Sequence, residues 1–196
     1  MSEVHIKTPV SEEETRSLKI GDKIHISGTI FTARDRAHKF LIDEAKPENL
    51  PFSLEGGAIY HCGPVVAGEG AEGRVIVAGP TTSARMNAYT PQIISRYGVR
   101  IIIGKGGMNK AVLGAMQECG AVYASGIGGA SVYLADFIKS IKGVYKLEEF
   151  GPPEAIWALE VQNFPAVVTM DSHGGSLHAE IARLSRLSLS SLLGTS

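Results

Sequence analysis

The sequence is poor in cysteine, in net charge and in long apolar runs, and each shortage excludes a class of protein. Its 196 residues include two cysteines, Cys62 and Cys119, which form no CxxC motif and are too few for a disulfide framework; we expect both to be buried small side chains. The net charge of −1 argues against general binding to nucleic acid or to a membrane surface. No run approaches the roughly 20 apolar residues of a membrane span. We therefore expect a soluble, cytoplasmic protein with no nucleic-acid and no membrane partner.

Internal repeats and low-complexity linkers are also missing, so a single domain over residues 1–196 is expected. Hydrophobic residues make up 44% of the chain and charged residues 20%, which is close to an average globular protein. Glycine, in contrast, is abundant: there are 23, several of them in adjacent pairs such as 106–107 and 128–129. Such pairs indicate turns at positive φ, or backbone that passes close to another group.

Expected strands and helices alternate along the chain, which predicts an α/β fold with a mixed sheet and flanking helices. Thr90-Pro91 is a typical helix start and Gly98 a typical end, and "VRIIIG" after them is an apolar run typical of a buried strand. The other expected elements are an extended lead-in at 1–15, a strand at 22–33 with Ile24, Ile26 and Ile30 on one side, a helix at 34–45, short strands in "GGAIYHCG" and "GRVIVAGP", a helix at 109–119, a strand in "AVYA", a helix at 130–143, strands at 144–150, 155–161 and 166–171, and a closing helix at 177–193.

Polar and glycine-rich segments follow four of these expected strands. The stretch "GPTTSARM" (79–86) follows the apolar run "RVIVA", which we interpret as a buried strand, and "GKGG", "SGIGG" and "TARDRAHK" follow three others. In open α/β sheets ligands bind beyond the carboxyl ends of the strands, so these segments are expected to meet. Arginine binds a carboxylate with two parallel hydrogen bonds, and N–H groups at helix starts add positive potential. The segments therefore predict an anion site, for which they offer Arg34, Arg36, His38, Thr81, Thr82, Ser83, Arg85 and Lys105.

Each of these residues also has an ordinary structural role open to it. The cations could be solvated surface charges, and threonine or serine between a strand and a helix is often a cap. Arg36 is expected at the surface, because on a helix it cannot face the same way as Arg34 two residues earlier. His38 could equally lie half-buried against the sheet, and His61 is expected to be structural.

The stretch "GIGGAS" (126–131) raises the alternative of a nucleotide-binding module. Gly126 and Gly128 fit a dinucleotide-binding fingerprint, and Glu148 lies at about the expected distance. Ser131 stands where glycine or alanine belongs, which makes this signal weak. The sequence has no GxSxG or HExxH motif and no histidine pair at helical metal-binding spacing, so no metal ligand is expected in this chain.

In chain order, "GTIFTARDRAHK", "GGAIYHCGP", "GPTTSARMNAYTP", "IIIGKGGM", "GGASVYLA" and "EAIWALEVQNFPAVVTMDSHG" resemble one known family. It comprises the β subunit of two-subunit class I fumarases and L-tartrate dehydratases, and the C-terminal domain of single-chain class I fumarases. The resemblance covers roughly residues 15–180 and implies a swivelling β/β/α domain. It implies a hydro-lyase that reversibly hydrates fumarate to (S)-malate, with dehydration of L-tartrate to oxaloacetate as the alternative. A third possibility is a non-catalytic swivelling domain of another assembly.

The resemblance further implies an iron–sulfur cofactor and a partner. In the family a [4Fe–4S] cluster is held by three cysteines of the α subunit, and the two cysteines of this chain are too few to replace them. The implied assembly is an α2β2 heterotetramer in which the β subunit binds the dicarboxylate.

Residue by residue, the resemblance assigns substrate binding to Arg34, Arg85 and Lys105, and we add Thr82 beside them. Thr81 matches the threonine proposed in the family as the base that removes the C3 proton, and either Lys105 or Arg85 is expected to assist it by stabilising its alkoxide. The sequence departs from the single-chain enzymes at "KGG", where they have "KGN", so a polar contact from that asparagine is missing here.

Overall fold

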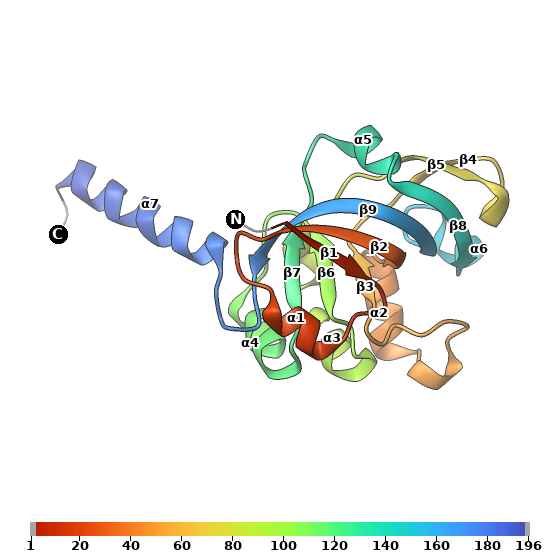
Figure 1. Ribbon diagram of the computed structural model, residues 1–196, viewed down its shortest axis with the longest axis horizontal. Helices are drawn as coiled ribbons and strands as arrows, with labels where there is room; N and C mark the ends of the chain where they lie inside the picture. The colour runs from red at the N-terminus through yellow and green to blue at the C-terminus, as the bar shows by residue number, and fades with distance from the viewer. Residues whose placement is uncertain (1–2, 195–196) are drawn as a thin grey trace.

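The computed structural model describes residues 3–194, which fold into strands and helices arranged around a curved sheet (Figure 1). The strands are β1 (Glu3–Lys7), β2 (Lys23–Thr32), β3 (Ala58–Tyr60), β4 (Val65–Ala67), β5 (Arg74–Val77), β6 (Ile101–Gly104), β7 (Val122–Ser125), β8 (Ile138–Tyr145) and β9 (Ile156–Met170). The α-helices are α1 (Glu12–Ser17), α2 (Asp35–Asp43), α3 (Thr90–Tyr97), α4 (Lys110–Cys119), α5 (Ser131–Ala135), α6 (Leu147–Phe150) and α7 (Leu177–Leu193), with 3-10 turns η1 (Pro47–Asn49), η2 (Gly70–Glu72) and η3 (Ser83–Met86).

The long strand β9 closes the main sheet into a barrel-like ring. The sheet has seven strands in the order β1-β2-β3-β6-β7-β9-β8, and β9 also pairs with β2. Strands β1, β2, β3, β6 and β7 run parallel to one another, whereas β9 is antiparallel to its neighbours β2, β7 and β8. Because β9 borders both β2 and β7, strands β2, β3, β6, β7 and β9 form a closed circuit, with β9 arching over the others in Figure 1. The predicted α/β architecture with a mixed sheet is confirmed.

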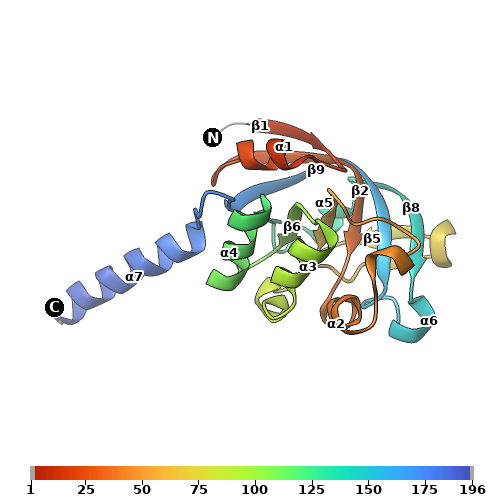
Figure 2. The same ribbon diagram turned by 90° about the horizontal axis from the view of Figure 1, so that it is seen from below.

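Two apolar cores lie on opposite faces of the parallel strands. Ile24, Ile26 and Ile30 belong to one core together with residues of all five strands of the ring, as the alternation in β2 predicted. The other core packs the sheet against helices α2, α3 and α4, which lie together on one side in Figure 2. Ile101 and Ile103 of β6 enter the first core and Ile102 the second. Burial on both faces explains why "IIIG" is a continuous apolar run.

Two predicted elements on the C-terminal side of the glycine-rich loop are wrong. The helix expected over 130–143 ends at Ala135, and residues from Ile138 onward form β8 instead. Antiparallel pairing with β9, for example Ile141 with Leu159, overrides the helical pattern. The strand expected over 144–150 ends at Tyr145, after which α6 begins.

The strands expected at 155–161 and 166–171 are one continuous strand, β9, in which Asn163 adopts a φ of 54°. At the N-terminus, β1 is extended as expected, but α1 begins at Glu12, inside the predicted lead-in. Its start is a capping box: Ser11 Oγ accepts from the Glu14 N–H, and the Glu14 carboxylate accepts from the Ser11 N–H. The sequence "SEEE" carries that signal.

Helix α7 projects away from the rest of the domain (Figures 1 and 2). It occupies the range expected for the closing helix, and all of its residues from Ala179 to Gly194, the last being its C-cap, are exposed. The exposed apolar side chains of α7 are Ile181, Leu184, Leu187, Leu189, Leu192 and Leu193. Within residues 3–194, no helix combines the length and the hydropathy needed to cross a membrane.

Candidate active site

Backbone hydrogen bonds bring the predicted loops together at the carboxyl ends of the parallel strands. The loop over 79–86 lies between the ends of β3 and β6, where the Thr81 N–H donates to His61 O at 2.7 Å and the Ser83 N–H donates to Lys105 O at 3.0 Å. Bridges join Cys62 to Pro80 and Thr82 to Lys105. On either side, the Ala33 N–H donates to Tyr60 O and the Gly126 N–H donates to Gly104 O. The predicted meeting of four segments is therefore observed.

The loop over 79–86 arrives from a different strand than predicted. We expected it to follow a buried strand of the sheet, but β5 pairs with β4 in a separate two-stranded sheet. The side chain of Ile76 in β5 is 42% exposed. The loop reaches the site because its own backbone pairs with the chain just after β3 and β6. The predicted position of the loop beside the other strand ends is therefore correct. The prediction that the strand before it, β5, is buried in the same sheet is wrong.

Arg85 is already paired with a carboxylate of this chain. Its Nε lies 3.1 Å from Asp35 Oδ1 and its Nη2 lies 2.6 Å from Asp35 Oδ2, which is the two-pronged geometry of a strong charge-assisted pair. Asp35 lies in the first turn of α2, directly after Arg34. The pair occupies the edge of the guanidinium group formed by Nε and Nη2, and Nη1 has no partner within residues 3–194, so that edge can face another carboxylate. Both side chains are about two-fifths exposed.

Arg34 is held close to the end of β3. Its Nε lies 3.3 Å from Glu154 Oε1, and both side chains are about three-quarters buried. A Cβ atom at Gly63 would lie 2.8 Å from Arg34 Nη1, so glycine there leaves room for the guanidinium group. Arg36 differs: it is exposed, with its guanidinium group 4.7 Å from the centre of the Phe150 ring, which confirms the surface position expected for it.

Thr81, Thr82 and Lys105 present polar groups that have no partner among the side chains of residues 3–194. Thr81 is partly buried, whereas Thr82 and Lys105 are exposed. The stem of Lys105 passes the loop after β7, where its Cδ lies 4.0 Å from the position of a Cβ atom at Gly128. Two free hydroxyls, one free ammonium group and one free guanidinium edge thus lie on loops that are joined to one another. This arrangement can bind a small anion with more than one carboxylate.

A buried polar cluster lies behind the loop over 79–86. Ser83 Oγ lies 2.9 Å from His61 Nδ1 and 2.9 Å from the Tyr123 hydroxyl, and His38 packs edge-on against His61 with ring centres 5.0 Å apart. Burial lowers the pKa of His38 to about 4. Burial, with the nearby His38 and Arg85, holds the pKa of His61 well below its usual range. Both imidazoles are therefore neutral at pH 7. We expected His61 to be structural and left His38 open, but nothing in the sequence indicated this cluster.

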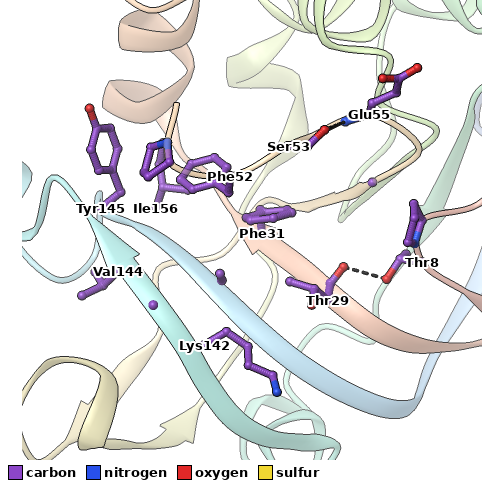
Figure 3. A pocket seen from close by; sticks show the side chains of 15 residues that line it. Thr8, Thr29, Phe31, Phe52, Ser53, Glu55, Lys142, Val144, Tyr145 and Ile156 are labelled. Atoms are coloured by element: carbon purple, nitrogen blue, oxygen red, sulfur yellow. Dashed lines mark hydrogen bonds between the residues drawn. The ribbon is translucent and has the colours of Figure 1, made fainter. Parts of the chain in front are cut away.

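A separate hollow of about 610 Å³ lies between the η1 loop and strands β2, β8 and β9 (Figure 3). Its lining is mainly apolar, with the rings of Phe31, Phe52 and Tyr145 beside Ile156. None of the predicted site residues lines it. An apolar lining does not suit a dicarboxylate, so the strand-end loops remain the candidate site.

The dinucleotide-binding alternative lacks its structural context. A fingerprint of that kind needs a helix that leads into a second parallel strand. Here the loop after β7 leads into α5, a helix of five residues, and the next strand, β8, pairs antiparallel with β9. The "GIGGAS" loop instead borders the candidate site.

Neither cysteine is placed to ligate a cluster. Cys62 is fully buried, and burial raises the pKa of its thiol to about 12, whereas a ligand must be a thiolate. Cys119 is partly buried at the end of α4 and is also free. Among residues 3–194 no group of three or more histidine, cysteine, aspartate or glutamate side chains could hold a metal ion. These residues do not fit an iron–sulfur cluster.

Comparison with known proteins places the chain in a family. The model of the family described as "Fumarase C-terminus" matches residues 1–181. The chain belongs to the fumarase C-terminus family. It is 47% identical over 188 residues to the protein of Geobacillus stearothermophilus named "Putative fumarate hydratase class I", an alignment that covers 95% of this chain. This chain spans 36% of the length of that relative.

A second relative matches this chain over most of its own length. The L(+)-tartrate dehydratase subunit beta of Escherichia coli strain K12 is 35% identical over 180 residues, which cover 91% of this chain and 88% of the relative. This chain therefore matches part of one longer relative and most of another relative that is named as a subunit.

Proposed function

We propose that this chain is the β subunit of a hydro-lyase that reversibly hydrates fumarate to (S)-malate. The observation that carries the proposal is the meeting of Arg34, Thr81, Arg85 and Lys105 on hydrogen-bonded loops at the strand ends. Membership of the fumarase C-terminus family supports the reaction class. The position of the site on loops at one end of the sheet suits a surface that a second subunit covers.

The proposed partner is an α subunit that holds a [4Fe–4S] cluster, in an α2β2 heterotetramer. The ligand set of this chain does not fit a cluster, and the name of the E. coli relative as a subunit beta supports a second chain. We propose further that this domain swivels against the partner to admit substrate. The reducing cytoplasm, which keeps cysteines as thiols, suits such an assembly.

In this proposal the cations of the chain bind the two carboxylates of the substrate. The free Nη1 edge of Arg85 takes one carboxylate while Asp35 holds the opposite edge of the same group. Lys105 and Arg34 supply the remaining positive charge, and the hydroxyl of Thr82 donates to a carboxylate oxygen. Asp35 and Glu154 offset part of the charge, so that the site carries a small local excess of positive charge rather than three unpaired cations.

In the dehydration direction, the Thr81 hydroxyl, ionised to its alkoxide, takes the proton from C3 of the hydroxy acid, and the C2–O bond breaks so that hydroxide leaves; the proton and the hydroxide together account for the water released. The Thr81 hydroxyl accepts no hydrogen bond from the side chains of residues 3–194, so its lone pairs are available. A threonine alkoxide is a strong base but needs a nearby cation to be populated, and Lys105 on the neighbouring loop supplies it. As the proton leaves, negative charge moves onto the adjacent carboxylate. Arg85 and Lys105 stabilise that charge, and such stabilisation is commonly the largest catalytic contribution.

L(+)-tartrate is the second candidate substrate, and the E. coli relative favours it. Tartrate differs from malate by one hydroxyl group, and the unpaired Thr82 hydroxyl could meet it. The two substrates otherwise make the same demands on Arg34, Arg85 and Lys105.

The test is co-expression of this chain with a three-cysteine α subunit, followed by anaerobic assays with (S)-malate and with each tartrate isomer. We expect turnover of (S)-malate by the pair and none by either subunit alone. Turnover of L(+)-tartrate alone would select the second candidate. Failure of a correctly assembled, cluster-loaded pair with all of these substrates would favour a non-catalytic domain, and titration with NAD, for which we expect no binding, tests the nucleotide alternative.

A further inference from the structure

The polar cluster behind the loop over 79–86 is completely buried. His38, His61, Ser83 and Tyr123 each have 0% exposed surface. They come from four different elements: α2, the end of β3, η3 and β7. Burying so many polar groups is costly unless they bind one another.

In each hydrogen bond of this cluster one atom must be the donor, and one choice of donors gives a partner to most of the buried polar atoms. Within residues 3–194, the hydrogen-bond partner of the Tyr123 hydroxyl is Ser83 Oγ. The Tyr123 O–H then donates to Ser83 Oγ, and the Ser83 O–H donates to His61 Nδ1. The reverse direction would leave the buried Tyr123 O–H without an acceptor, which costs about 1–3 kcal/mol. The chain of donors therefore fixes His61 as the tautomer with its proton on Nε2.

His38 completes the arrangement on the other side. Its Nδ1 lies 2.9 Å from Arg34 O, a carbonyl that can only accept, so the proton of this neutral ring is on Nδ1. His38 Nε2 is then an acceptor and His61 Nε2–H a donor, and both atoms are buried without a protein partner. One of the two unpaired atoms is thus an acceptor and the other a donor, on rings that pack edge-on against each other.

The last residue of β6 confirms how closely the cluster is packed. A Cβ atom at Gly104 would overlap Ser83 Oγ and would lie 3.1 Å from His61 Nδ1 and 3.2 Å from the Tyr123 hydroxyl. Gly104 has no positive φ, so the need for glycine here is steric. The residue before Lys105 thus has no side chain because Ser83 occupies that space.

We propose that Ser83, His61 and Tyr123 form a positioning network that holds the loop of Thr81, Thr82 and Arg85 in register with the loop of Lys105. This inference rests on the proposed function for its catalytic consequence. Ser83 is two residues from Thr81 and two from Arg85, and its hydroxyl is bonded to residues at the ends of β3 and in β7. Without the hydroxyl, the loop keeps its backbone bonds but loses its buried attachment. A displacement of about 1 Å at a reacting group can cost 10²-fold in rate.

The first test does not depend on activity. Nitrogen-15 NMR of the histidine rings in the full chain reports which ring nitrogen carries the proton. We expect protonated Nε2 at His61 and protonated Nδ1 at His38 in the wild type, with a changed His61 signal in Ser83→Ala and in Tyr123→Phe. A His61 ring protonated on Nδ1 in the wild type would overturn the direction of the network.

The second test uses the assembled pair with (S)-malate and L(+)-tartrate. We expect Ser83→Ala and Tyr123→Phe each to lower kcat by about 10- to 100-fold, with KM changed less than about threefold. Gly104→Ala should both destabilise the chain and lower kcat. Adding Ser83→Ala to Gly104→Ala should recover stability but not kcat, which a purely structural role does not predict.

The control is Gly114→Ala in α4, where no atom lies within 4 Å of the added Cβ, and kcat should not change. Wild-type kcat in both Ser83→Ala and Tyr123→Phe would refute the positioning role while leaving the proposed function standing. An inactive wild-type pair would instead refute the proposed function, and the NMR result alone would then decide whether the network exists.

Discussion

Replacing Arg85 by lysine separates substrate binding from folding more clearly than any other single change. The guanidinium group has five N–H donors, and two of them are committed to Asp35 at 3.1 Å and 2.6 Å. A lysine can keep an ion pair with Asp35, but its ammonium group cannot at the same time offer a second planar edge to a substrate carboxylate. The variant therefore keeps the internal pair and loses the external one.

The substitution Arg85→Lys should affect turnover much more than stability. Loss of a charge-assisted hydrogen bond to the developing charge costs about 1.5–3 kcal/mol, and removal of one such donor from a transition state lowers turnover by about 10²–10³-fold. The pair with Asp35 is about two-fifths exposed, so its contribution to stability is at most about 1 kcal/mol. For a chain of this length that corresponds to a change in Tm of about 2–4 °C or less.

The assay compares kcat/KM of the assembled enzyme with thermal unfolding of the same sample. We expect Arg85→Lys to lose at least about 10²-fold in kcat/KM with a nearly unchanged Tm. Arg36→Lys is the matched control, because Arg36 is exposed and stacks on Phe150, and its kcat/KM should stay within about threefold. An assembled Arg85→Lys enzyme with near-normal turnover would refute the assignment of Arg85.

Three further predictions concern the fold. The pKa of His38 is lowered to about 4 in the folded chain but is about 6.5 in the unfolded chain, so the unfolded state binds a proton at higher pH than the folded state does. The free energy of unfolding should therefore fall by about 2 kcal/mol between pH 8 and pH 5 because of this group alone, and His61 acts in the same direction. Urea titrations of the wild type and of His38→Gln should show a weaker pH dependence in the variant. Gly104→Ala should lower the free energy of unfolding by about 1–3 kcal/mol through overpacking, whereas Gly114→Ala should be neutral or stabilise by up to about 1 kcal/mol, as measured by urea unfolding; equal effects would contradict the packing around Ser83. Ending the chain after Ala182 removes only exposed helix and should leave the Tm within about 4 °C, whereas a larger drop would mean that α7 packs on this domain.

The pattern of apolar residues along the chain predicted those strands in which buried side chains alternate or are continuous. The alternation of Ile24, Ile26 and Ile30 predicted their shared core, and the unbroken run of Ile101 to Ile103 predicted a strand covered on both faces. The region after β7 failed because pairing partners decide it. Residues 138–145 are a strand only because β9 lies beside them, and β9 follows in sequence. No local pattern carries that information.

The candidate site likewise has a part that the sequence predicted and a part that it did not. Arg34 and Lys105 follow β2 and β6, so the rule that parallel strands end at one edge was enough to predict that they lie at the same edge. Thr81 lies on a loop that follows β5 of the other sheet and reaches that edge through backbone bonds, which the rule does not predict. The pair between Arg85 and Asp35 joins residues 50 positions apart, and the bond between Ser83 and Tyr123 joins residues 40 apart. Such side-chain pairings depend on the folded geometry and could not be predicted from residue types.

We propose that the strand-end loops of this chain form half of an active site. The most direct measurement is the anaerobic rate of (S)-malate dehydration by the assembled pair, with wild-type chain, Lys105→Met and the exposed control Lys110→Met compared at equal assembly and cluster content. We expect a loss of at least about 10²-fold for Lys105→Met and little change for Lys110→Met. Wild-type turnover in the Lys105→Met pair, or turnover by the partner subunit alone, would contradict it.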